Sequence, residues 1–196
     1  MPDSTVIGWL KKHKQMNKHF IIILLLTAYF SGIMANAQSL LINEIQSSNI
    51  SCIADFDGDY SDWVELYNYG TDVIELEGLF LSDKPNNLNK WEFPNRAIMP
   101  GEYLIIWASG KDKVCENGEI HTNFSIKASG ETIFLVHSNG HTIIDKSYNQ
   151  ALPQDMSMGR IPDNTISWYF FSDPTPGMAN NTEAFEGFSP QACFSV

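Results

Sequence analysis

Residues 132–147, TIFLVHSNGHTIIDKS, decide the fold class of this chain. The two halves of the stretch are rich in β-branched and aromatic residues, and Asn139 and Gly140 lie between them. Asn-Gly at the centre of a two-residue loop favours a type I′ turn, because both residue types tolerate positive φ. The stretch therefore predicts a β-hairpin with strands at 132–137 and 142–147.

Short apolar runs of the same kind recur from residue 38 onward, separated by Gly, Asn, Asp and Pro, and no segment has a convincing helical period. This pattern is typical of an all-β sandwich or barrel. In residues 63–67, WVELY, apolar residues follow one another without regular alternation, which predicts a strand buried on both faces. The other expected strands are 40–45, 73–76 with 79–81, 90–93, 103–108 and 168–171.

The first 37 residues have the organisation of a secretory signal peptide. Four lysines precede an apolar run of about 11 residues at 20–30, and Ala35-Asn36-Ala37 follows as an A-x-A cleavage site. The run is short for a membrane span, which needs roughly 20 residues. We therefore expect an N-terminal signal helix, cleavage after Ala37, and a secreted or cell-surface product without stable membrane insertion. An uncleaved N-terminal anchor is the alternative.

Removal of residues 1–37 takes away four lysines and one aspartate, so the net charge changes from −11 to −14. Nucleic acid and anionic lipid surfaces attract proteins through Lys and Arg, so this balance argues against both as partners. It favours solubility and divalent cations instead. The remaining 159 residues are enough for one domain with a core of its own.

The chain has three cysteines, Cys52, Cys115 and Cys193. A disulfide is permitted in an exported protein, and an odd count leaves one thiol over. We expect Cys52 to pair with Cys115, because both lie in loop-like segments of the same domain; two unpaired, small apolar side chains are the alternative. No C-x-x-C motif is present, so the sequence supports neither a zinc site nor a thioredoxin-type motif.

Four aspartates within eight residues form the main candidate for a metal site. Calcium takes six to eight oxygen ligands, and carboxylates at alternate positions of a turning loop can converge on one ion. The spacing is not that of an EF-hand, because Tyr60 and Leu66 stand where that loop needs Gly and Glu. A solvated turn, in which one of the last two aspartates accepts backbone N–H groups, is the alternative. The residues are Asp55, Asp57, Asp59 and Asp62.

Several segments, in this order and spacing, resemble the lamin tail domain in its bacterial secreted form. The resemblance implies an immunoglobulin-like antiparallel β-sandwich over residues 38–180. It also implies an accessory module of secreted or surface proteins, found beside hydrolases, nucleases or kinase-type domains, with no catalytic residues to carry over. The segments are LINEI (41–45), DFDGDYSDWVELYN (55–68), GLFLSD (78–83), KWEFP (90–94), GEYL (101–104), HTNF (121–124), SGET (129–132), SMGR (157–160) and PTPG (174–177).

The segment Pro174-Thr175-Pro176-Gly177 is expected to close the folded region, because neither proline can donate to a β-ladder. Residues 181–196 lack the length of a strand and resemble a linker. We expect this tail to be the beginning of a further module in a longer chain.

No motif in the sequence specifies a nucleophile. There is no G-x-S-x-G elbow, and although acidic residues are plentiful, nothing singles out two of them as a glycosidase pair. His137 and His141 straddle the hairpin turn at positions that point to opposite faces, so they are not expected to bind one metal. His121 stands alone and is interpreted as a structural residue.

The aromatic residues allow two interpretations. One or two exposed rings could form a sugar-binding platform, but rings at strand positions more often fill a β-sandwich core. Tyr60 and Tyr69, which are next to turns, are the rings that we expect to be exposed.

Export, the sandwich pattern and the absence of a catalytic motif together favour a non-catalytic extracellular binding or attachment module. Its expected partner is an extracellular protein or a glycan. A structural spacer that positions a neighbouring hydrolase or adhesion domain is the first alternative. A calcium-dependent hydrolase centred on residues 55–62 is the second. Calcium is the one cofactor for which the sequence gives a reason.

Overall fold

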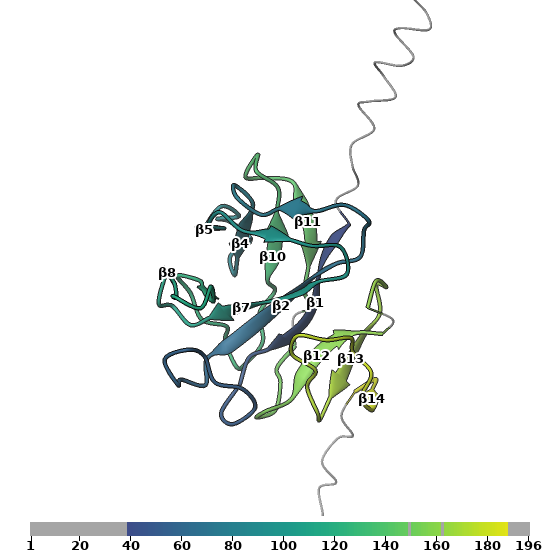
Figure 1. Ribbon diagram of the computed structural model, residues 1–196. Helices are drawn as coiled ribbons and strands as arrows, with labels where there is room; N and C mark the ends of the chain where they lie inside the picture. The colour runs from purple at the N-terminus through teal and green to yellow at the C-terminus, as the bar shows by residue number, and fades with distance from the viewer. Residues whose placement is uncertain (1–38, 149, 162, 188–196) are drawn as a thin grey trace, which may run out of the picture. The chain divides into compact units, whose positions relative to one another are not determined.

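The computed structural model describes residues 39–148, 150–161 and 163–187, which form strands and loops (Figure 1). Within these ranges there is no helix, and so none that could cross a membrane. The predicted signal peptide and Cys193 lie outside the described residues. The expected all-β class is confirmed over the part of the chain that the structure describes.

The larger sheet has eight strands, in the order β14-β13-β12-β1-β2-β7-β9-β8. All neighbours pair antiparallel except β7 and β9, which are parallel. The expectation of a purely antiparallel sandwich is therefore corrected at this edge of the sheet. The strands are β14 (Ala184–Phe185), β13 (Trp168–Phe171), β12 (Ser157–Arg160), β1 (Leu40–Gln46), β2 (Asp62–Asn68), β7 (Tyr103–Ala108), β9 (Ile120–His121) and β8 (Lys113–Val114).

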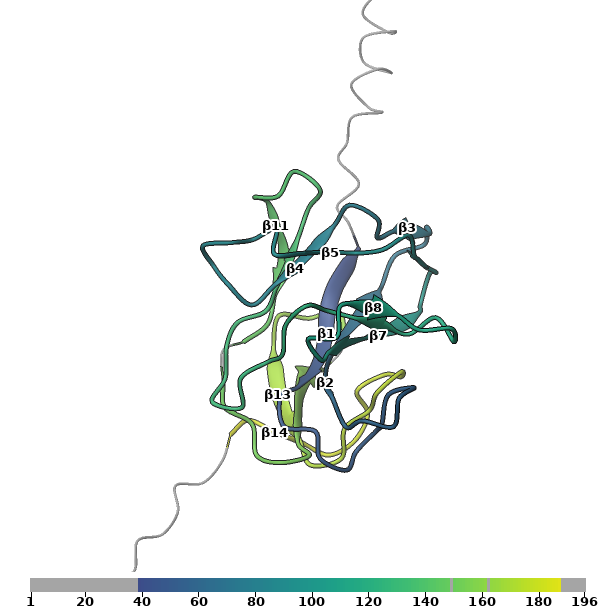
Figure 2. The same cartoon turned by 90° about the vertical axis from the view of Figure 1, so that its left-hand side faces the viewer.

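A second sheet has four antiparallel strands in the order β11-β10-β4-β5, and β3 and β6 form a separate pair. In both views the strands β4, β5 and β11 lie together on one side of β1 and β2 (Figure 2). Two layers of this kind are consistent with an immunoglobulin-like sandwich. The strands are β11 (Ile143–Lys146), β10 (Phe134–Val136), β4 (Phe80–Ser82), β5 (Trp91–Glu92), β3 (Ile74–Glu75) and β6 (Ala97–Ile98).

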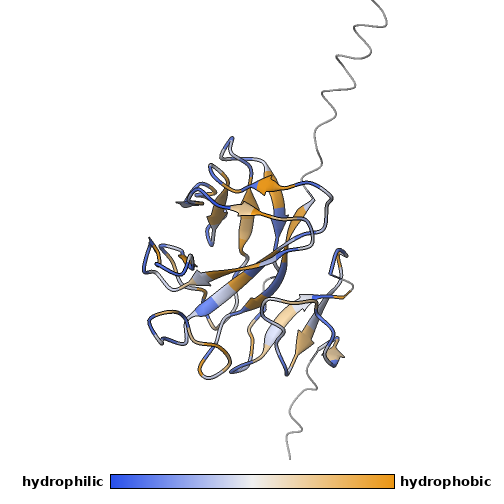
Figure 3. Cartoon of the chain, viewed as in Figure 1, coloured by the Kyte–Doolittle hydropathy of each residue, from blue (hydrophilic) through white to orange (hydrophobic). Residues whose placement is uncertain are grey.

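The hydrophobic core takes side chains from both sheets, and the hydropathy colouring shows the loops as mainly hydrophilic (Figure 3). Each fully buried Leu or Ile side chain in such a core contributes about 1.5–3 kcal/mol of transfer free energy. From the larger sheet come residues of β1, β2 and β7, and from the smaller sheet residues of β4, β5 and β10. Among them are Leu40, Ile42, Ile45, Val64, Leu66, Ile106, Leu81, Trp91 and Leu135.

A β-bulge in β1 changes which side chains face the core. The pairing with β2 shifts between Ile42 and Glu44, so Asn43 is the extra residue. Without the bulge, strict alternation would turn Ile45 away from the core that Ile42 enters. With it, both isoleucines are buried in the core, and Glu44 stands opposite Glu65 on the other face of the sheet.

The eight predicted strand regions correspond to nine strands, because the run with the break at 77–78 forms both β3 and β4. β2 is buried on both faces as predicted, from Trp63 to Leu66. Five short strands were not predicted: β6, β8, β9, β12 and β14. β14 lies within the predicted linker and pairs with β13, so the fold continues beyond residue 180.

The predicted hairpin is present as β10 and β11, but its turn differs from the prediction. The N–H of His137 donates to the carbonyl of Thr142 at 2.9 Å, as the expected register requires. Gly140 has a φ of 74°, whereas Asn139 has no positive φ, so the type I′ prediction is wrong. The Asn139 side-chain oxygen instead accepts the N–H groups of His141 and Thr142, as in an Asx turn.

Candidate functional site

The acidic loop, residues 55–62, is organised around Asp55. Its carboxylate Oδ1 accepts the backbone N–H groups of Asp57 and Asp59, each at 3.0 Å, and its Oδ2 accepts the Ser61 hydroxyl at 3.0 Å. A loop of this kind is an Asx turn. Asp55 therefore does the work that the sequence assigned to one of the last two aspartates.

Two lysines from outside the acidic loop form ion pairs with its aspartates. Lys111 Nζ lies 2.6 Å from Asp55, 2.7 Å from Asp57 and 2.9 Å from Asp59, measured to a carboxylate oxygen of each. Lys113 Nζ lies 2.6 Å from Asp57. Hydrogen bonds from the two lysines lower the pKa of Asp57 to about 2. An ammonium group therefore stands among the three carboxylates that the sequence proposed for calcium.

Asp62 does not join these three carboxylates. Its Oδ1 accepts the N–H of Asn49 at 3.4 Å, and burial raises its pKa to about 6. The structure thus brings together three of the four predicted ligands, namely Asp55, Asp57 and Asp59, whose oxygens lie within 4.8 Å of one another. Calcium binding by this loop stays a prediction.

The rest of the long β1–β2 connection exposes apolar side chains. Ile50, Phe56 and Tyr60 have 54, 55 and 49% of their surface exposed. Val114 on β8 is also 54% exposed, and the N–H of Phe56 donates to Glu119 in the β8–β9 hairpin at 2.8 Å. The loop and the hairpin therefore meet, and together they present apolar side chains to solvent.

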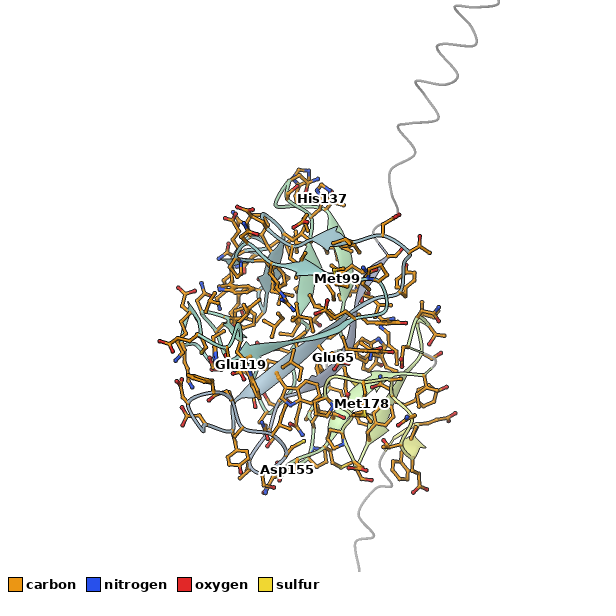
Figure 4. The ribbon with its side chains drawn as sticks, in the orientation of Figure 1. Glu65, Met99, Glu119, His137, Asp155 and Met178 are labelled. Carbon is orange, nitrogen blue, oxygen red and sulfur yellow. The ribbon has the colours of Figure 1, made fainter. Side chains whose placement is uncertain are left out.

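The larger sheet carries a buried pair of acidic residues that the sequence did not single out. Glu44 on β1 and Glu65 on β2 have no exposed surface, and Glu65 lies in the middle of the molecule (Figure 4). Burial raises the pKa of both side chains, that of Glu65 to about 8, and the charge of Glu44 raises the pKa of Glu65 further. The signal in the sequence is the apolar spacing in LLINEI (40–45), which is two residues from Leu40 to Ile42 and three from Ile42 to Ile45.

Residues 174–180, here called the C-terminal strap, supply two of the four residues that donate hydrogen bonds to this pair. Thr175 donates its N–H to Glu44 at 3.1 Å, and Gly177 donates its N–H to Glu65 at 2.5 Å. Asn43 donates to Glu65 at 3.0 Å, and Ser157 donates to Glu44. The segment PTPG therefore closes over the sheet and satisfies buried acids, where the sequence predicted only the end of the fold.

The Thr175 hydroxyl links Glu44 to Asn180. The Thr175 Oγ1 lies 3.0 Å from Glu44 Oε2 and 2.8 Å from Asn180 Oδ1. The Asn180 amide nitrogen already donates to the carbonyl of Arg160 at 2.9 Å, which fixes Oδ1 as an acceptor. A hydroxyl has one proton to donate, so Thr175 can donate to one of these two oxygens at a time.

Cys52 and Cys115 are free thiols, so the predicted pairing between them is absent. Cys52 belongs to a turn in which its N–H donates to Asn49 at 3.1 Å. The sulfur of Cys115 instead faces the ring of His121, with Nε2 at 3.4 Å. The two cysteines are held by different local contacts, which spacing along the chain does not reveal.

The buried and exposed aromatic and histidine side chains can be compared with the predictions. Trp63, Trp91 and Trp107 are buried, whereas Tyr60 and Tyr69 are exposed. His137 and His141 lie in the exposed hairpin turn, and each ring contacts groups of that turn. His121 was predicted to be structural and is fully buried, with Nδ1 at 2.9 Å from Ser109 Oγ.

Comparison with known proteins identifies a family. A family model described as Lamin Tail Domain matches residues 34–150. No curated protein matches the chain. The matched region contains the acidic loop, both buried glutamates and the β10–β11 hairpin, whereas the strap follows it.

Proposed function

Because the chain belongs to the lamin tail domain family, we propose that it is a non-catalytic binding or attachment module of a secreted or cell-surface protein. Export rests on the basic and apolar segments of residues 1–37 and on the A-x-A site that follows them. The family and the all-β architecture support a module that presents loops from a rigid scaffold.

The observation that carries this proposal is the complete burial of Glu44 and Glu65. Two acids with raised pKa values would fit acid–base catalysis if a substrate could reach them. Both are fully buried, and the oxygens of both accept hydrogen bonds from the strap or from neighbouring strands. This pair therefore belongs to the interior of the domain, and we assign recognition to exposed loops among the described residues.

The β1–β2 loop is the recognition surface that we propose. Phe56 and Tyr60 are rings of the kind that dominate interface energetics, and both are about half exposed. The Asx turn and the ammonium of Lys111 hold the loop in one conformation, which limits the entropy lost on binding. The proposed partner is an extracellular protein or a glycan that can pack on these rings.

Binding of the exported chain, residues 38–196, to glycan arrays and to panels of cell-surface and matrix proteins tests the proposal. We expect specific binding that falls at least tenfold in a variant with both Phe56→Ser and Tyr60→Ser. The control is Ile166→Ser, which removes a side chain that is 91% exposed at another place in the chain. A folded chain that binds nothing in either panel, or equal binding by the double variant, contradicts the proposal.

A further inference from the structure

We propose that Cys115, Glu119 and His121 form a binding site for Zn²⁺ or a cation of similar chemistry on the β8–β9 hairpin. This inference is independent of the proposed binding function. It also departs from the sequence, in which the absence of C-x-x-C gave no support for zinc.

The hairpin places the three donors on one face. The N–H of Cys115 donates to the carbonyl of Glu119 at 2.8 Å, and Lys113 pairs with His121 two residues further along each strand. Because side chains two residues apart on a strand share a face, Glu119 and His121 point the same way as Cys115. Gly118, with a φ of 87°, makes the tight turn between them.

The donor atoms have the separations of a tetrahedral zinc site. Zinc–sulfur and zinc–nitrogen bonds of about 2.3 and 2.0 Å at tetrahedral angles put the sulfur and nitrogen about 3.5 Å apart. Cys115 Sγ and His121 Nε2 are 3.4 Å apart, and Nε2 lies 3.9 Å from Glu119 Oε2. All three donors lie within 4.8 Å of one another, so small side-chain movements bring them onto one ion.

His121 is prepared for this role. Ser109 Oγ lies 2.9 Å from Nδ1, so it can accept a hydrogen bond from Nδ1–H. The Nε2 lone pair then faces Cys115. Burial lowers the pKa of the ring, which favours the neutral form that binds metals. The ring therefore has its orientation and its tautomer defined before an ion arrives.

The charges around the site suit a cation. The ammonium groups of Lys111 and Lys113 are paired with aspartates of the acidic loop. The Glu119 side chain is 28% exposed, so a water molecule can take the fourth position. A thiolate and an imidazole favour zinc over calcium or magnesium, which prefer oxygen ligands only.

Cobalt substitution gives a direct test, because a cobalt–thiolate bond adds a charge-transfer band in the near ultraviolet. The exported chain in a Cys193→Ser background, kept reduced, is titrated with Co²⁺ and then with Zn²⁺. We expect one equivalent of Co²⁺ to produce the band and Zn²⁺ to remove it. Cys115→Ser should lose the band, whereas Cys52→Ser, the matched control, should retain it.

Two further variants separate metal binding from folding. Glu119→Gln should weaken binding, and its melting temperature without metal measures separately the loss of a hydrogen bond from Phe56 or Asn117. Ser109→Ala should weaken binding about tenfold, as loss of a group that orients a ligand histidine typically does. No band in the folded reference chain, or a band that survives Cys115→Ser, overturns the site. A reactive Cys115 thiol without cobalt binding would assign the pair to nucleophilic chemistry and also overturn it.

Discussion

Glu44 and Glu65 face each other across β1 and β2, buried on the side of the larger sheet that the C-terminal strap covers. Two ionised carboxylates this close inside a protein would repel strongly. Burial raises the pKa of both, that of Glu65 to about 8, so at neutral pH the folded domain holds a proton on Glu65 that the unfolded chain has already released.

The stability of the domain should therefore fall between pH 4.5 and 8. Glu65 has a pKa of 4.5 when unperturbed and of about 8 in the fold, so its contribution is complete below pH 4.5 and is lost as the pH rises through 8. Glu65→Gln should flatten this part of the profile. Urea unfolding at pH 5 and pH 8 measures it, with Glu77→Gln, an exposed residue, as the control.

Glu65→Gln should nevertheless be less stable than the reference chain at pH 5. The two oxygens of Glu65 accept N–H groups from Asn43 and Gly177, and a glutamine amide nitrogen can accept neither. One buried donor then loses its acceptor, at a cost of about 1–3 kcal/mol. A variant with the same pH slope as the reference chain would show that Glu65 is not the group that titrates.

Thr175→Val tests the strap directly. The substitution keeps the shape and the backbone N–H but removes the hydroxyl that contacts Glu44 and Asn180. We expect the free energy of unfolding to decrease by about 1–3 kcal/mol, because buried polar atoms lose a partner. Thr182→Val removes an exposed hydroxyl that bonds the carbonyl of Asp173, and should change stability by less. Equal effects of the two variants would argue against a special role for the strap.

Lys111→Met should expose the repulsion within the acidic loop. Asp55 is buried and loses its ammonium partner, so we expect a decrease in stability on the order of 2 kcal/mol, between the values for surface and buried pairs. The stability that the lowered pKa of Asp57 contributes is present above pH 3.8 and lost as the pH falls through about 2. In Lys111→Met, less stability should be lost as the pH falls through about 2, because the pKa of Asp57 is then lowered less.

The same variant should respond to calcium more strongly than the reference chain, because a calcium ion must otherwise displace the Lys111 ammonium. Thermal melts with millimolar calcium and with a chelator measure this difference. Lys127→Met, at a more exposed lysine, is the matched control. A larger calcium shift in the reference chain than in Lys111→Met would show that the ion and the ammonium do not compete.

The sequence predicted elements whose signal is local and missed those that depend on a partner. The hairpin and the strand with Trp63 carry enough β-branched and aromatic residues to be recognised. By contrast, β12 reads SMGR and has one apolar residue that reaches the core, Met158. It forms a strand because β1 and β13 supply its hydrogen bonds on both sides.

The candidate sites likewise combine residues that the sequence indicated with partners that it did not. Four aspartates in eight residues are visible in any reading of the chain, and three of them do converge. Lys111 enters the acidic loop from about fifty residues away, and Cys115 meets His121 only because β8 and β9 fold back on each other. Contacts of that kind follow from the register of strands, which local composition does not determine.

A carbon-13 NMR titration of the Glu44 and Glu65 carboxyls measures whether these two side chains are closed off from solvent inside the fold. We expect Glu65 to titrate near pH 8 and Glu44 above its usual value, with slow exchange of the Thr175 and Gly177 amides. Titration of both near pH 4.5, with fast amide exchange, would mean that solvent reaches the pair and would contradict the account.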